Sequence, residues 1–208
     1  MHTWAHAYDR GRTALPWAWR ASKKLRGSVM IYVCSLAELP RFAEAVRPSH
    51  LISLLGDDPF PPTPDSVAEG AHLKVHMHDI VAPAPGCITP EAAHLEELID
   101  FADRWRRAGP MVIHCYAGIS RSTAAALVVL CRYNRGREAE AARLLREQAP
   151  HAYPNRRMVD LADALMGCEG RLIAAVDDMS LPDLLSPQSP VSLHARIGET
   201  SGNMPTKC

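Results

Sequence analysis

The chain has 208 residues, and its 23 Lys and Arg side chains are balanced by 23 Asp and Glu, so the formal net charge is zero. A hydrophobic fraction of 47% with 22% charged residues is typical of a globular protein and excludes a wholly disordered or fibrous chain. The longest apolar stretch, Ala124 to Cys131, is far shorter than the roughly 18 residues of a membrane span. No membrane is therefore expected as a partner. A net charge of zero lacks the electrostatic attraction to phosphate on which nucleic-acid binding depends, so nucleic acid is not expected as a partner either.

The cysteines and histidines bear on redox compartment and metal binding. The chain has six cysteines in 208 residues, and they lie at irregular intervals. This cysteine content is far below the roughly 8–10% that is typical of a disulfide scaffold. A reducing, cytoplasmic setting is therefore expected. Alternate histidines on a strand share a face, but no Cys or Glu stands at a recognisable ligand spacing. No metal and no cofactor is therefore expected. The histidines that could suggest a metal site are His72, His76, His78 and His94.

Strand and helix patterns alternate along the chain. Residues 1–27 show no sustained period and are expected to form a loosely ordered leader. Ser35 and Glu38 have the spacing of a capping box, and Thr89–Pro90–Glu91 reads as a helix start with the threonine as cap. In chain order the pattern predicts a strand at Val29–Val33, a helix to about Val46, strands at His50–Leu55 and His72–His78, a helix from Thr89 to Gly109, a strand at Met111–His114, and helices at Ser122–Tyr133, Arg137–Gln148, Asn155–Met166 and Arg171–Met179.

This alternation predicts an α/β fold with a mostly parallel central sheet and helices on both faces. We expect one folded domain over residues 28–179. From residue 180 to 208 prolines and serines dominate, so this tail is expected to be disordered.

One segment between a predicted strand and a predicted helix carries the chemistry: His114-Cys115-Tyr116-Ala117-Gly118-Ile119-Ser120-Arg121-Ser122. A cysteine six positions before an arginine is weak evidence alone, because Cys131 and Arg137 have the same spacing without the rest of the pattern. The added histidine, glycine and serine, in a strand–loop–helix context, make the longer pattern specific.

The reactivity of such a segment follows from its parts. A helix N-terminus or a neighbouring cation favours the thiolate, which is the reactive form of cysteine, and Cys115 is expected to have both. A short loop can turn its backbone N–H groups inward to form an anion-binding nest, and Gly118 permits the positive φ that this curl needs. Arg121 can close the ring with a planar fork that matches two phosphate oxygens.

The segment resembles the signature loop of cysteine-dependent protein tyrosine phosphatases, most closely the dual-specificity branch, including bacterial-type tyrosine phosphatase-like proteins. The resemblance covers about residues 28–166 and identifies 28–179 as a phosphatase domain. It implies that Cys115 attacks phosphorus to give a phosphocysteine, that Arg121 binds the phosphoryl oxygens, and that Ser122 stabilises the leaving thiolate. It also implies that His114 holds the loop geometry and that the loop residues bind phosphate: Tyr116, Ala117, Gly118, Ile119, Ser120 and Arg121.

The resemblance further implies a general acid about 30 to 40 residues before the cysteine. Asp79 fits because it follows a predicted strand and precedes Cys115 by 36 positions; an aspartate there would protonate the leaving oxygen and later deprotonate water. The competing candidates lie in a proline-rich loop: Asp57, Asp58 and Asp65. The segment Tyr153–Leu161 is similar to a Pro-Asn segment of the family, which implies that Asn155 binds the signature loop, although Asp160 stands where glutamine is usual.

The expected function is therefore a metal-independent phosphomonoester hydrolase, a protein tyrosine or dual-specificity phosphatase whose substrate is a phosphorylated protein or peptide. A binding-only pseudophosphatase is one alternative, although both Cys115 and Arg121 are present. A thiolate enzyme that handles sulfur or arsenate is another, and it would not need Asp79. A lipid or inositol phosphatase is disfavoured because Tyr116, Ala117, Ile119 and Ser120 place no basic side chain inside the loop.

Overall fold

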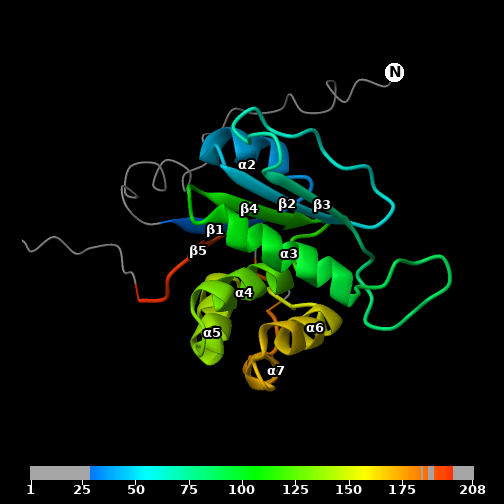
Figure 1. Ribbon diagram of the computed structural model, residues 1–208, viewed down its shortest axis with the longest axis vertical. Helices are drawn as coiled ribbons and strands as arrows, with labels where there is room; N and C mark the ends of the chain where they lie inside the picture. The colour runs from blue at the N-terminus through cyan, green and yellow to red at the C-terminus, as the bar shows by residue number, and fades with distance from the viewer. Residues whose placement is uncertain (1–28, 184, 187–189, 199–208) are drawn as a thin grey trace, which may run out of the picture.

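The apolar runs of the sequence form a five-stranded sheet (Figure 1). In the computed structural model, which describes residues 29–183, 185–186 and 190–198, the strands lie in the order β3-β2-β4-β1-β5. Every pairing is parallel except that of β5 with β1, so the predicted mostly parallel sheet is confirmed. The strands are β1 (Met30–Ser35), β2 (His50–Leu55), β3 (His72–His76), β4 (Met111–Cys115) and β5 (Val191–His194).

Strand β1 shows how the sheet separates two cores. Successive side chains of a strand point to opposite faces, and all but the last residue of β1 are buried. Ile31 and Val33 join the larger core, whereas Met30, Tyr32 and Cys34 join the smaller one. A strand buried on both faces reads as a continuous apolar run, as expected for the interior of a parallel sheet.

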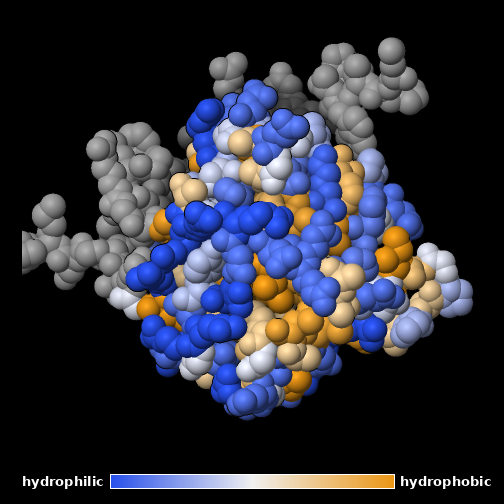
Figure 2. Space-filling view, in the orientation of Figure 1, coloured by the Kyte–Doolittle hydropathy of each residue, from blue (hydrophilic) through white to orange (hydrophobic). Residues whose placement is uncertain are grey.

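Helices cover both faces of the sheet, as predicted (Figure 1). Helix α2 packs on one face, next to β1, while α3, α4 and α5 pack on the other, and α6 and α7 pack outside them. No helix in the described ranges is long and apolar enough to span a membrane, and the face shown in Figure 2 mixes hydrophilic with apolar residues. The helices are α2 (Leu39–Val46), α3 (Ala92–Trp105), α4 (Arg121–Tyr133), α5 (Glu138–Gln148), α6 (Arg156–Met166) and α7 (Arg171–Asp177).

Neither predicted helix start coincides with the N-cap in the structure. Ser35 and Glu38 make the reciprocal bonds of a capping box, with the Ser35 N–H donating to Glu38 Oε2 (3.1 Å) and the Glu38 N–H to Ser35 Oγ (3.3 Å). Helix α2 nevertheless begins at Leu39, and its N-cap residue is Glu38 rather than Ser35. The prediction that Thr89 caps α3 is wrong. Glu91 is the extended N-cap residue, and its N–H donates to Nδ1 of His94 at 3.1 Å, so the cap lies two residues later than the sequence indicated.

The proline- and serine-rich tail contains a strand where disorder was expected. Val191–His194 pairs antiparallel with β1, and Val191 and Leu193 are buried. Asn134 fixes the segment that follows, because its amide donates to the Ala195 carbonyl (2.8 Å) and its carbonyl accepts from the Ile197 N–H (3.0 Å). The alternation in four residues is too short a signal to outweigh the surrounding composition. The predicted leader, residues 1–27, lies outside the described residues.

Candidate active site

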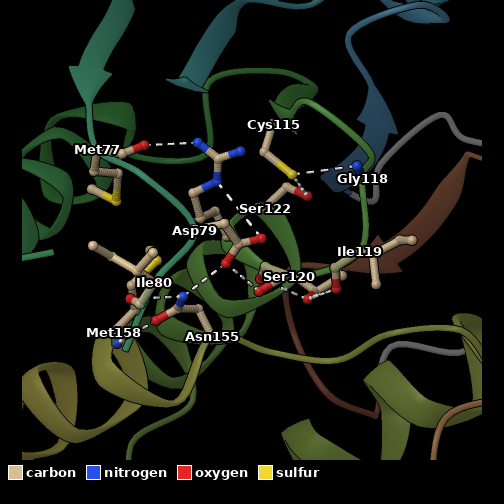
Figure 3. Close-up of polar contacts among 12 residues, drawn as sticks. Met77, Asp79, Ile80, Cys115, Gly118, Ile119, Ser120, Ser122, Asn155 and Met158 are labelled. Atoms are coloured by element: carbon tan, nitrogen blue, oxygen red, sulfur yellow. Dashed lines mark hydrogen bonds and ion pairs between the residues drawn. The ribbon is translucent and has the colours of Figure 1, made fainter. Parts of the chain in front are cut away.

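Cys115 is the last residue of β4, a central strand, at the carboxyl edge of the parallel sheet. Ligand sites of open α/β sheets form at this edge, near the point where the strand order reverses. The loop Cys115–Arg121, here called the signature loop, leads directly into α4 (Figure 3). The sequence thus places the cysteine between a buried strand and the positive end of a helix, as predicted.

Several carbonyl groups of the signature loop point outward. Three of its carbonyls accept hydrogen bonds from backbone N–H groups of neighbouring segments, and no peptide bond of the described residues is cis. In a planar trans peptide the N–H points opposite to the carbonyl, so the following N–H groups face the interior of the loop. The bonds are Leu36 N–H to Tyr116 O (3.1 Å), Tyr153 N–H to Ile119 O (2.9 Å) and Asn155 N–H to Ser120 O (3.4 Å).

The Cys115 sulfur lies at the floor of this loop, with 1% of the residue exposed. The Gly118 N–H donates to Sγ at 3.3 Å, and Ser122 Oγ lies 3.1 Å from Sγ (Figure 3). Gly118 has φ +77°, and a Cβ there would lie 2.9 Å from the carbonyl carbon of Cys34. Only glycine fits this close approach without strain, so the curl of the loop depends on it.

Arg121 closes the loop and leaves part of its guanidinium open. The residue is 7% exposed, and Nη1 donates to the Met77 carbonyl at 2.7 Å. Nε is buried without a hydrogen-bond partner and lies 3.9 Å from Oδ2 of Asp79. A buried N–H with no acceptor is costly unless something binds it. This guanidinium is therefore suited to hold an anion over the sulfur.

Asp79 lies at the same edge, beyond the end of β3 (Figure 3). Its Oδ1 accepts hydrogen bonds from Ser120 Oγ (2.7 Å) and Asn155 Nδ2 (2.8 Å), and its side chain is 38% exposed. Of the competing carboxylates, Asp57 pairs with His78 at 3.2 Å with its side chain 88% exposed. The structure therefore brings Asp79 to the signature loop.

Asn155 contacts the signature loop differently from the prediction. Its backbone N–H reaches the Ser120 carbonyl, but its side chain donates to Asp79 and, at 3.4 Å, to the Ile80 carbonyl. Its Oδ1 accepts from the Met158 N–H at 3.2 Å. The side chain therefore caps α6 and holds the aspartate segment, because the loop carbonyl is already bound by the Asn155 backbone.

His114 is buried directly behind Cys115. Its Nε2 lies 2.6 Å from Ser53 Oγ and its Nδ1 3.3 Å from the Cys115 carbonyl. Burial lowers the pKa of His114 to about 4; the bond to Cys115 opposes this shift and the charge of Arg121 adds to it. Ser53, which contacts His114, is not among the predicted site residues. Its signal was a single hydroxyl inside an otherwise apolar buried strand, at 0% exposure.

Two aromatic side chains stand at the outside of the loop. Tyr116 is 61% exposed and Tyr153 is 63% exposed, unlike the buried core aromatics. Exposed aromatic side chains beside a polar site suit contact with a ligand. The phosphate contact of Tyr116 stays a prediction.

No three His, Cys, Asp or Glu side chains within the described segments gather where they could hold a metal ion. The histidines considered from the sequence are bonded to separate partners. His72 reaches Ser53 and Thr63, His76 the Gly56 carbonyl, His78 the Asp57 carboxylate, and His94 the Glu91 N–H.

Sequence comparisons give no match for this chain, either among models of protein families or among curated proteins. Solved structures do match its fold. DUSP15 is 21% identical with a TM-score of 0.50, and covers 76% of this chain and 96% of its own. The PTP-2 phosphatase of Cydia pomonella is 22% identical (TM-score 0.52; 64% and 84% covered), and human DUSP28 is 21% identical (TM-score 0.51; 66% and 94% covered).

These structures are dual-specificity-type phosphatases, and the chain shares their α/β fold. The resemblance inferred from the residues around Cys115 is thereby confirmed at the level of the fold. Function is argued from the geometry of the site, since one fold serves many activities.

Proposed function

We propose that this protein is a cysteine-dependent phosphomonoester hydrolase acting on phosphorylated proteins or peptides. One observation carries the proposal: the Cys115 sulfur accepts a hydrogen bond from the Gly118 N–H at the N-terminus of α4, in a loop closed by a buried Arg121 whose Nε has no hydrogen-bond partner. The arrangement offers a nucleophile and an anion site at one point. A phosphate dianion bound there would neutralise the open guanidinium and place phosphorus in line with the sulfur.

The reaction would proceed in two displacements. In the first, the Cys115 thiolate forms a bond to phosphorus, the phosphorus–oxygen ester bond breaks, and the proton of the Asp79 carboxylic acid passes to the leaving oxygen. In the second, water attacks phosphorus, the sulfur–phosphorus bond breaks, and the Asp79 carboxylate accepts the proton of the water. Ser122, 3.1 Å from the sulfur, would donate a hydrogen bond to the departing thiolate. The products are an alcohol or phenol and inorganic phosphate.

The substrate class follows from the surroundings of the loop. The side chains of Tyr116, Ala117, Ile119 and Ser120 bring no positive charge for additional phosphates. The exposed rings of Tyr116 and Tyr153 offer contacts for a peptide or an aryl group. The structurally similar proteins are phosphatases of the dual-specificity type. A single phosphorylated side chain on a protein is therefore the proposed substrate.

The test is hydrolysis of an aryl phosphate by the purified protein in the presence of a chelator. Cys115→Ser should lower kcat on the order of 10⁴-fold or more while inorganic phosphate still binds. Cys131→Ser is the matched control, because it changes the same side chain in the second Cys–Arg pair and should retain most activity. No hydrolysis by the wild-type protein, with phosphate binding intact, would indicate a binding-only protein instead.

Asp79→Asn separates phosphoryl transfer from other thiolate chemistry. A phosphatase needs the carboxyl proton for its leaving group, whereas sulfur transfer or arsenate reduction at the same cysteine does not. Full activity of Asp79→Asn toward a phosphoester with a poor leaving group would contradict the assigned role. The same enzyme should then be assayed with thiosulfate and with arsenate.

A further inference from the structure

A chain of four side chains runs from the proline-rich loop to the nucleophile through the interior of the sheet. Thr63 Oγ1 lies 2.7 Å from His72 Nδ1, and His72 Nε2 lies 2.8 Å from Ser53 Oγ. The same Ser53 oxygen lies 2.6 Å from His114 Nε2. The chain ends where His114 Nδ1 meets the Cys115 carbonyl at 3.3 Å.

The chemistry of the end groups fixes the direction of every bond in this chain. A carbonyl only accepts, so His114 must carry its proton on Nδ1. Burial lowers the pKa of both His72 and His114 to about 4, with nearby positive charge contributing at each, so both rings are neutral at pH 7. A neutral imidazole has one donor and one acceptor, which makes His114 Nε2 an acceptor of the Ser53 hydroxyl proton.

The remaining protons then follow. Ser53 has a single hydroxyl hydrogen, already donated to His114, so its oxygen must accept from His72 Nε2–H. His72 Nδ1 is therefore unprotonated and accepts from the Thr63 hydroxyl. All the hydrogen bonds point from Thr63 toward Cys115, and each intermediate group both accepts and donates.

This direction matters for the anion site because of the peptide between Cys115 and Tyr116. A Cys115 carbonyl held by His114 faces away from the loop interior, so the Tyr116 N–H on the same peptide faces into it. The carbonyls of Tyr116, Ile119 and Ser120 are held outward by backbone donors of other segments. The first peptide of the loop is held by this side-chain chain instead.

We propose that Ser53 and His72 are positioning residues, which fix the tautomer of His114 and thereby keep the Tyr116 N–H directed at the bound phosphoryl group. The role of the Tyr116 N–H in binding a phosphoryl group rests on the proposed function. The tautomers assigned to His72 and His114 do not depend on any activity. Neither residue contacts the reacting atoms, so each acts through His114.

The direct test is the tautomeric state of the two histidines, measured by long-range proton–nitrogen correlation NMR on the wild-type protein at pH 7.5. We expect His114 to be protonated at Nδ1 and His72 at Nε2. The opposite tautomer in either ring would overturn the assignment. This measurement needs no variant and would stand even if the protein hydrolysed no phosphoester.

The functional test compares Ser53→Ala with Ser53→Thr, which restores a hydroxyl. Alkylation of Cys115 by iodoacetamide at pH 7.5 is followed by mass spectrometry over a series of inorganic phosphate concentrations. In Ser53→Ala the Tyr116 N–H is no longer held toward the anion, and loss of this hydrogen bond to a charged group should raise the phosphate concentration for half-maximal protection roughly tenfold. Ser53→Thr should stay close to the wild type.

Ser49→Ala is the matched control. Ser49 precedes the same strand and also bonds a histidine, with Oγ 3.1 Å from His50 Nδ1, but at the amino edge of the sheet. Its alkylation profile should equal that of the wild type. An unshifted profile in Ser53→Ala, or an equal shift in Ser49→Ala, would overturn the positioning role.

Discussion

The chain contains two cysteines that stand six positions before an arginine, and the two pairs flank the same helix. Cys115 ends β4 and Arg121 begins α4, so the loop between them lies at the N-terminus of the helix, whereas Cys131 lies in the last turn of α4 and Arg137 follows its end. The N-terminus of a helix carries partial positive charge and the C-terminus partial negative charge. The first pair therefore lies where the helix favours a bound anion, and the second lies where the helix disfavours one.

The partners of the two pairs differ in the same sense. Arg137 uses Nε and Nη2 on Glu140 (2.9 and 2.6 Å) and Nη1 on the Ile197 carbonyl (2.8 Å), whereas Arg121 leaves Nε open. Burial, followed by the nearby Glu138 and Cys168, raises the pKa of the Cys131 thiol. The spacing of a cysteine and an arginine therefore does not by itself make an anion site. The site at Cys115 also needs the end of a buried strand, backbone N–H groups that face the sulfur, and an arginine with an unused N–H donor.

The largest expected difference between the pairs is in the arginines. Arg121→Lys should lower kcat toward an aryl phosphate on the order of 10²–10³-fold, because a point charge cannot replace the planar fork. Arg137→Lys should remain within about twofold of the wild type, since its bonds lie on the surface. Steady-state kinetics of both proteins decide this, and similar losses in the two would contradict the assignment of Arg121.

The carboxylates offer the next contrast. Asp79→Asn should reduce kcat about 10²-fold for an alkyl phosphate, whose leaving oxygen needs a proton, and far less for a phosphate with an acidic phenol. Asp57→Asn is the control, because Asp57 pairs with His78 in the exposed loop. Equal losses for good and poor leaving groups would remove Asp79 as the acid.

One glycine in each segment allows the cost of a positive φ to be separated from the cost of a steric clash. Gly118 and Gly136 both have φ +77°, but a Cβ on Gly136 meets nothing within 4 Å, whereas one on Gly118 meets the backbone of Cys34 and Ser35. Gly136→Ala should lower the free energy of unfolding by about 1 kcal/mol for the positive φ alone. Gly118→Ala should cost at least about 2 kcal/mol.

Urea unfolding of the two alanine variants measures this difference. Equal losses of stability would mean that the signature loop moves away from β1 without cost. In that case the close approach at Gly118 would not hold the loop.

The smallest effect concerns the residue before each cysteine, which is His114 in one pair and Leu130 in the other. The pKa of His114 falls from 6.5 to about 4 on burial, so the folded state binds fewer protons than the unfolded state between these values. Its contribution to stability is present above pH 6.5 and is lost as the pH falls toward 4. Between pH 7.5 and 5.5 the loss should be about 1 kcal/mol.

Urea unfolding at several pH values tests this sign. The wild-type protein should lose stability on acidification, and His114→Gln should lose less over the same range, because the titrating group is gone. Parallel pH profiles would show that His114 titrates alike in both states.

Much of this architecture was predictable because long apolar runs and strong helix breakers dominate it. The strand His50–Leu55 and the helices after Ser122 agree with the pattern within a residue or two at most boundaries. The signature loop was predictable because its chemistry is encoded in consecutive residues. Asp79 could be ranked first because it follows a predicted strand and stands at the separation from Cys115 that the family resemblance implies.

What the sequence did not reveal depends on contacts between distant segments. Ser53 and His72 bond across neighbouring strands, and their pairing depends on the register of the sheet. The Met77 contact with Arg121 is made by a backbone carbonyl, which no side-chain pattern encodes. The cap of α3 and the short strand β5 were misjudged because weak local signals yield to tertiary packing.

Strand β5 has a consequence for the order in which the sheet can be completed. Its partner β1 comes from the first described residues, about 160 positions earlier in the chain, so this pairing closes a very long loop. Until residues 191–194 arrive, the backbone of β1 presents an open edge that another molecule could pair with. A protein ending near residue 180 would keep every group of the proposed site, yet it would be prone to self-association through that edge.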